Sequence, residues 1–142
     1  MKMQHDRACA TAALPPSLLA LLHEIADLQE RLATRDEPGA IDLRALPLLP
    51  GEREALRSVL GQGEVTVRLD ALGESEIHET RLAGVWWVRH ADREGETVAE
   101  FIEVATVPAI LHSDRRDVEN ACHVLREQLR EWAGSGNPGE ES

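Results

Sequence analysis

The spacing of apolar residues changes twice along this 142-residue chain, and no other feature of the sequence constrains the fold more strongly. Apolar side chains recur every three or four residues over 18–32, alternate with polar ones over 65–104, and return to helical spacing over 118–132. Helices therefore flank a run of strands and do not alternate with them. This segregation predicts an α+β fold with an antiparallel sheet.

The N-terminal half is expected to contain two helices. Ser17 is a candidate N-cap for an amphipathic helix that continues to about residue 34. A short helix is expected over Glu52–Leu60, where Gly61 follows as a stop signal. The residues between these helices, 34–50, include Pro38, Pro47 and Pro50 and are expected to form an extended connection.

The alternating region predicts four short strands in sequence, which favours an antiparallel meander. The third and fourth strands flank Asp92-Arg93-Glu94-Gly95, where Gly95 can take the left-handed position of a hairpin loop. The expected strands are 65–70, 76–82, 85–90 and 97–105.

A long C-terminal helix follows, capped by Ser113 or Asp114. Its apolar stripe consists of Val118, Ala121, Cys122, Leu125, Leu129 and Trp132. Residues 15–133 are thus expected to form a single α+β domain. The segments on either side, 1–14 and 134–142, lack periodicity and are predicted to be a disordered leader and a disordered tail.

Charge and cysteine content exclude several classes of function. The formal net charge of −11 opposes binding to a phosphate backbone or to an anionic membrane surface. No apolar run approaches the roughly 20 residues that a membrane span needs, and none resembles a signal peptide. Cys9 and Cys122 are poorly arranged for a structural disulfide. The composition therefore predicts a cytoplasmic protein that binds neither nucleic acid nor membrane.

A search for catalytic motifs finds no nucleophile elbow, no phosphate-binding loop and no set of metal ligands, so the chain is predicted to be no enzyme and to need no cofactor. Two alternatives stay open. A small ligand-binding module or enzyme would place His78, Trp86 or His90 in a pocket between sheet and helices. A metal or cluster carrier would require Cys9 and Cys122 to meet.

The adjacent residues Trp86 and Trp87 lie in the third strand, where neighbouring side chains point to opposite faces. With Gly95 left-handed, the hairpin sets Trp87 opposite Phe101 and Trp86 opposite Ile102. One face is then aliphatic and is predicted to pack under the helices. It carries Trp86, Val88, Val98, Ile102 and Val104.

The second face of this hairpin combines aromatic and charged side chains, which are typical anchors of protein interfaces. It carries Val85, Trp87, Arg89, Ala99, Phe101 and Glu103. Ten acidic and four basic side chains lie between residues 64 and 103 and would form a charged rim. We expect this face to dock a client protein or a second copy of the chain. In the alternative, an N-terminal helix covers it within the same chain.

Four sequence blocks resemble the C-terminal conserved region of the hydrogenase expression/formation proteins of the HupH/HyaF type. The blocks are GEV at 63–65, EIHET at 76–80, GVWWVRH at 84–90 and AEFIEVATVPAIL at 99–111. The resemblance implies a non-catalytic, chaperone-like factor in assembly of a nickel–iron uptake hydrogenase, with the iron–sulfur small subunit precursor as client. It adds Glu79 to the candidate partner-binding residues and identifies no catalytic residue. Family members often contain two related regions where this chain has one.

Overall fold

The computed structural model describes residues 14–135, which divide into two units, 14–108 and 109–135, treated separately below. The predicted leader and tail lie almost wholly outside these residues, although Leu14 packs against the core. The first unit contains α2 (Pro16–Arg35), β1 (Gly39–Asp42), α3 (Glu52–Leu60), β2 (Thr66–Asp70), β3 (Glu74–Glu79), β4 (Val85–Ala91) and β5 (Thr97–Val104). The second contains the 3₁₀ helix η1 (Ala109–Leu111) and α4 (Arg115–Gly134).

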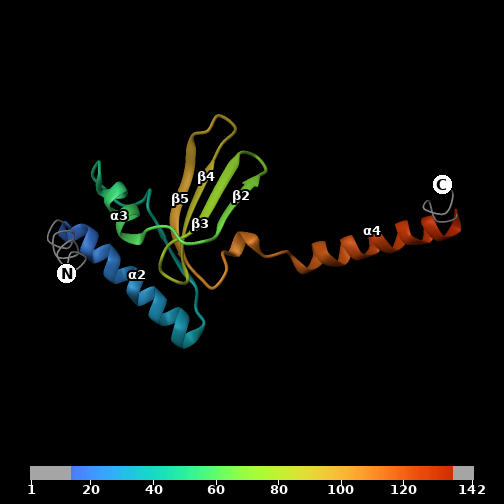
Figure 1. Cartoon of the computed structure of the whole chain (residues 1–142), viewed down its shortest axis with the longest axis horizontal. Helices are drawn as coiled ribbons and strands as arrows, with labels where there is room; N and C mark the ends of the chain where they lie inside the picture. The colour runs from blue at the N-terminus through green and yellow to red at the C-terminus, as the bar shows by residue number, and fades with distance from the viewer. Residues whose placement is uncertain (1–13, 136–142) are drawn as a thin grey trace. The chain divides into compact units, whose positions relative to one another are not determined.

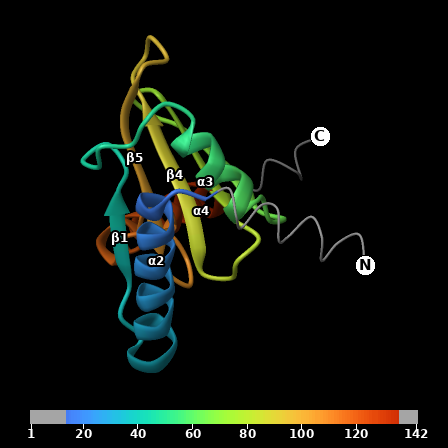
Figure 2. The same cartoon turned by 90° about the vertical axis from the view of Figure 1, so that its left-hand side faces the viewer.

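The sheet is antiparallel and has the strand order β1-β5-β4-β3-β2 (Figures 1 and 2). The α+β class is confirmed, and the four predicted strands are β2 to β5. The predicted strand number is wrong, because β1 adds a fifth strand beside β5. This strand lies in the segment that was expected to be an extended connection. It has only four residues, which is too short for an alternating pattern to stand out.

Both helices of the first unit cover the same face of the sheet, as the two views in Figures 1 and 2 show. Leucines of α2 and α3 meet this face, and burial of such side chains is the main source of stability. Trp87 lies in the middle of this core and is 1% exposed. The core consists of Leu18, Leu21, Ile25, Ile41, Leu43, Leu56, Leu60, Val85, Trp87, Ile102 and Val104.

The start of α2 differs from the prediction that Ser17 is its N-cap. Pro15 occupies the cap position, and Pro16 opens the helix with a backbone angle already suited to it. The Ser17 Oγ instead donates a hydrogen bond of 2.6 Å to Oε2 of Glu52. Glu52 also accepts from the Leu49 backbone N–H at 2.9 Å. Both hydrogen bonds, the one from Ser17 foremost, lower the pKa of Glu52, and the bond from Ser17 joins the first turns of α2 and α3.

The β4–β5 hairpin confirms the predicted turn, since Gly95 has a φ of 85° and Ala91 pairs with Thr97. A β-bulge then intervenes: His90 pairs with Ala99, which leaves Val98 as the extra residue. The pairing beyond the bulge is therefore shifted by one residue from the predicted register. Trp87 lies opposite Ile102, and Trp86 lies opposite Glu103.

In the second unit, α4 begins where the sequence predicted. The Asp114 carboxylate accepts a hydrogen bond of 2.8 Å from the Arg116 backbone N–H, as an N-cap does. Every residue of α4 is exposed, including Cys122 and the rest of the apolar stripe.

Candidate partner-binding surface

The six predicted partner-binding residues lie on two faces of the sheet, not on one. Because the bulge shifts the register, the helix-covered face takes the predicted residues of β4 and the opposite face takes those of β5. The predicted assignment of the two tryptophans is therefore wrong. Val85, Trp87 and Arg89 share the helix-covered face, whereas Phe101, Glu103 and Glu79 share the other face.

Trp87 is a core residue. It packs with Leu18, Leu21 and Ile25 of α2, so the alternative in which an N-terminal helix covers this face is the observed arrangement. Trp86 is also buried, at 7% exposure, but on the opposite face, where its Nε1 donates a hydrogen bond of 3.0 Å to the Ala105 carbonyl. Both tryptophans are therefore packed within the fold.

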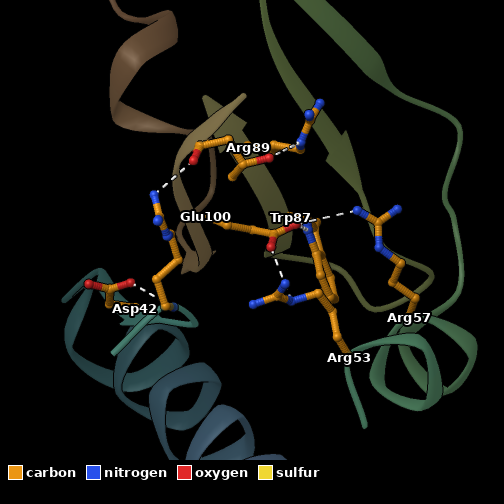
Figure 3. Close-up of polar contacts among 8 residues, drawn as sticks. Asp42, Arg53, Arg57, Trp87, Arg89 and Glu100 are labelled. Carbon is orange, nitrogen blue, oxygen red and sulfur yellow. Dashed lines mark hydrogen bonds and ion pairs between the residues drawn. The ribbon is translucent and has the colours of Figure 1, made fainter. Parts of the chain in front are cut away.

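A buried carboxylate fixes Trp87 in place (Figure 3). The Trp87 Nε1 donates a 2.9 Å hydrogen bond to Oε2 of Glu100, a residue only 4% exposed. Arg57 Nη2 lies 3.4 Å from the same oxygen, and Arg53 Nε lies 3.1 Å from Oε1. The Arg57 guanidinium is 4.7 Å from the centre of the Trp87 ring, within cation–π range. Two arginines one helical turn apart thus neutralise Glu100 and attach α3 to the sheet.

This network was not predicted from the sequence. Glu100 and Glu103 lie on opposite faces of the sheet, as their spacing of three residues in one strand requires. The available signal was the i, i+4 spacing of Arg53 and Arg57 on a short amphipathic helix. A buried acidic residue on the facing strand was needed to interpret that spacing.

His78 stacks beside Trp87 at the edge of the same face. The two ring centroids are 6.3 Å apart, and the ring planes differ by 7°. Burial lowers the pKa of His78, and the nearby positive charge of Arg57 lowers it further, while Glu76 opposes the shift. His78 lines a polar groove of 340 Å³ together with Arg57, Ser58, Gln62 and Glu76.

The pocket that the enzyme or ligand-binding alternative requires is not formed by the expected side chains. His78 shares the helix-covered face with Trp87, whereas His90 lies on the opposite face, where its Nδ1 is 2.7 Å from the Ser75 Oγ. Trp86 is buried. These three residues therefore do not converge on one cavity.

A second groove, of 680 Å³, lies along β1 and β5 on the face that α2 and α3 leave open. Phe101 forms part of its wall, half-buried and 5.8 Å from the His90 ring. Val98, the bulged residue, is 54% exposed beside it. The groove is lined by Ala40, Asp42, Arg44, Ala45, Val98, Ala99 and Phe101.

The rim of this groove carries one charge of each sign. The Arg44 backbone N–H donates to Asp42 Oδ1 at 2.9 Å, and Arg44 Nη1 donates to the Thr97 carbonyl at 2.9 Å. These bonds hold both charged side chains beside an apolar wall. A surface of this kind is suited to a protein segment with an apolar side chain and a flanking charge. We define Asp42, Arg44, Val98, Ala99 and Phe101 as the β1–β5 groove.

Among residues 14–135, no three His, Cys, Asp or Glu side chains lie close enough to hold a metal ion. Cys122 is exposed, and Cys9 lies outside that range, so the structure does not place the two thiols relative to each other. None of the described helices is long and apolar enough to cross a membrane.

Comparison with known proteins matches residues 17–132 to the C-terminal conserved region of the HupH hydrogenase expression protein. The hydrogenase expression/formation protein HoxQ of Azotobacter vinelandii is 34% identical over 96 residues, covering 68% of this chain and 33% of HoxQ. The hydrogenase-1 operon protein HyaF of Escherichia coli is 28% identical over 129 residues, covering 88% of this chain and 45% of HyaF. This chain thus spans a third to under a half of the length of these relatives.

A solved structure agrees with these matches. The hydrogenase expression protein HupH from Thiobacillus denitrificans is 44% identical, with a TM-score of 0.77 over 82% of this chain and 98% of that one. This chain and that HupH are thus similar both in fold and in sequence. The chain belongs to the HupH hydrogenase expression protein family, through the C-terminal conserved region of that family.

Proposed function

We propose that this chain is a non-catalytic accessory factor in the maturation of a nickel–iron uptake hydrogenase and acts in the cytoplasm. Family membership supports the role in maturation, because the relatives are named hydrogenase expression/formation proteins. The absence of a converging set of His78, Trp86 and His90 supports binding over catalysis. The client in this proposal is a hydrogenase subunit precursor, namely that of the iron–sulfur small subunit.

The observation that carries the binding role is the β1–β5 groove. Phe101 and Val98 offer apolar surface there, while Asp42 and Arg44 offer charges at its rim. A subunit that has not yet assembled exposes apolar surface that its partner subunit later covers. Of the six predicted partner-binding residues, we retain Phe101 as a contact, with Glu103 and Glu79 on the same face.

The test is co-purification from cells arrested before the hydrogenase subunits assemble. We expect the tagged chain to recover the small subunit precursor and to recover much less of the mature heterodimer. Equal recovery of mature heterodimer and free precursor would contradict the proposal. Recovery of the large subunit precursor alone would contradict the choice of client.

Variants can assign the binding to the groove. Val98→Asp places a charge on the exposed apolar residue of the groove and is expected to abolish recovery of the precursor. Val65→Asp makes the same change at a 42% exposed valine outside the groove and serves as the matched control. If both variants bind as the wild type does, the groove is not the binding site.

Metal analysis of the anaerobically purified chain separates this role from that of a metal or cluster carrier. Iron–sulfur clusters usually take four cysteine ligands, and this chain has two cysteines. We expect no stoichiometric iron, nickel or zinc. Retention of one of these metals at one equivalent would favour the carrier function.

A further inference from the structure

The helix α4 presents an apolar stripe that no residue of its own unit, 109–135, buries. It is 20 residues long, or about 30 Å, and its large apolar side chains are half-exposed. Val118 is 55% exposed, Leu125 51%, Leu129 50% and Trp132 45%. Contiguous exposed apolar surface of this extent marks an interaction site.

The spacing of the stripe is suited to a second helix. Steps of four and three residues alternate along it, which is the repeat of a two-helix seam. The stripe is also narrow, since charged side chains border it on one side and Ala121 and Gln128 border it on the other, whereas a helix that packs on a sheet or in a core has a wider apolar face. The seam consists of Val118, Cys122, Leu125, Leu129 and Trp132.

We propose that α4 pairs in antiparallel orientation with α4 of a second copy of this chain. In the register that places Cys122 opposite the partner's Leu125, Val118 lies opposite the partner's Leu129. The four seam residues from Val118 to Leu129 thus each meet an apolar residue of the other copy.

Charged residues at the ends and flanks of the seam favour this partner and this orientation. Arg115 lies one seam step before Val118, and in the antiparallel register it faces the partner's Trp132, an arrangement suited to a cation–π contact. Glu119 flanks the seam beside the partner's Arg126. The two-fold symmetry repeats both contacts, so the pair gains two of each.

In a parallel pair, the same residues would make unfavourable contacts. Seam residues then face their own counterparts, so Arg115 meets the partner's Arg115. Asp114 lies beside the partner's Glu119, which adds repulsion between like charges at each of the two equivalent positions. Charge complementarity within one helix sequence therefore selects the antiparallel pair.

The first experiment measures the mass of the full chain in solution by sedimentation velocity at concentrations up to about 1 mM, where even a weak dimer is populated. We expect a concentration-dependent dimer. Leu125→Asp, in the seam, should raise the dissociation constant about a hundredfold or more, because it buries a charge at two central positions. Val124→Asp makes the same change at the adjacent, 56% exposed residue outside the seam and should leave the dimer intact.

The second experiment tests orientation by charge reversal. Glu119→Arg and Arg126→Glu should each weaken the dimer about tenfold, since each replaces two attractive pairs with two repulsive ones. An equimolar mixture of these two variants should dimerise again, because each reversed residue then meets its opposite charge. The double variant should also recover. Circular dichroism and tryptophan fluorescence confirm that the 14–108 unit stays folded in every variant.

Three results would overturn the proposal. A monomer at about 1 mM would show that α4 is covered by something other than a second copy. Equal effects of Val124→Asp and Leu125→Asp would show that the seam is not the contact. Failure of the mixture to recover after each single reversal has weakened the dimer would exclude the antiparallel register.

Discussion

The helices α2 and α4 have the same length, 20 residues, and each carries a leucine-rich apolar stripe. Their environments differ completely. In α2, Leu18, Leu21 and Ile25 are at most 5% exposed, whereas α4 has no buried residue. An apolar stripe therefore indicates that a helix face will be covered, but it does not identify the covering surface.

The order of the elements along the chain explains why residues of the same chain cover α2. The strand β1 follows α2 directly and adds to the sheet beside β5, which places Ile41 and Ile102 under the helix. No strand follows α4 in the described residues. Under our proposal a second copy of the chain covers α4, so the stability that this contact adds depends on protein concentration.

The largest expected difference between the two regions concerns their tryptophans. Trp87→Ala should destabilise the 14–108 unit by about 4 kcal/mol, because it empties the centre of the core and removes a hydrogen bond to Glu100. Trp132→Ala in α4 should change the same unfolding free energy by less than about 0.5 kcal/mol. Urea unfolding followed by circular dichroism measures both. Comparable losses would mean that α4 contributes to the core of that unit.

A smaller difference is expected for buried and exposed carboxylates. Glu100→Ala should cost about 2–3 kcal/mol, because it leaves Trp87 Nε1 without an acceptor and removes the partner of Arg53 and Arg57. The arginines are about 40% exposed, so water limits the loss. Glu127→Ala in α4 is the control and should have almost no effect on unfolding. A loss below about 1 kcal/mol for Glu100→Ala would contradict the proposed role of this network.

The contact between α2 and α3 should weaken in acid. Hydrogen bonds from Ser17 and Leu49 hold the pKa of Glu52 below its ordinary value of 4.5. The unfolded chain therefore binds the proton more readily, and the stabilisation present above pH 4.5 is lost as the pH falls through the folded-state pKa. Glu52→Gln should reduce the loss of unfolding free energy between pH 6 and pH 3, as measured by urea unfolding. If Glu52→Gln loses as much unfolding free energy in acid as the wild type, other groups cause the acid sensitivity.

The smallest effect concerns His78. Its pKa in the folded chain lies below the ordinary value of 6.5, so the unfolded chain binds the proton first as the pH falls. Stability is therefore complete above pH 6.5 and declines below it, until the folded-state pKa is reached. His78→Gln should remove this decline, while His123→Gln, at an exposed position in α4, should keep it. An equal pH profile for wild type and His78→Gln would contradict the assignment.

The sequence was sufficient to predict the helices and most strands because their signals are local. Periodicity, Gly61 and Asp114 place α3 and the start of α4 where the structure has them. The strand β1 was not predicted, because its four residues gain their structure from pairing with β5. The strand propensity of a short segment does not reveal its pairing with a strand that is distant in sequence.

The candidate site was harder to predict because it depends on register. The turn at Gly95 was predicted correctly, but the bulge at Val98 exchanged the faces of Phe101 and Ile102. Nothing in the residues around Val98 distinguishes a bulge from a regular strand. The Glu100 network was missed for a related reason, since it joins α3 to a strand about 43 residues further along the chain.

The bulge at Val98 also bears on how this domain can change in length during evolution. Most positions in a hairpin strand tolerate substitution better than deletion, because a deletion exchanges inward and outward side chains beyond it. Here the deletion of Val98 would make the pairing regular, keep the turn intact and leave Phe101 opposite Val88 and Ile102 opposite Trp87. A lineage could therefore lose this one residue without compensating changes elsewhere in β5. Position 98 is thus the place in this hairpin where a difference of one residue in length is expected to be tolerated best.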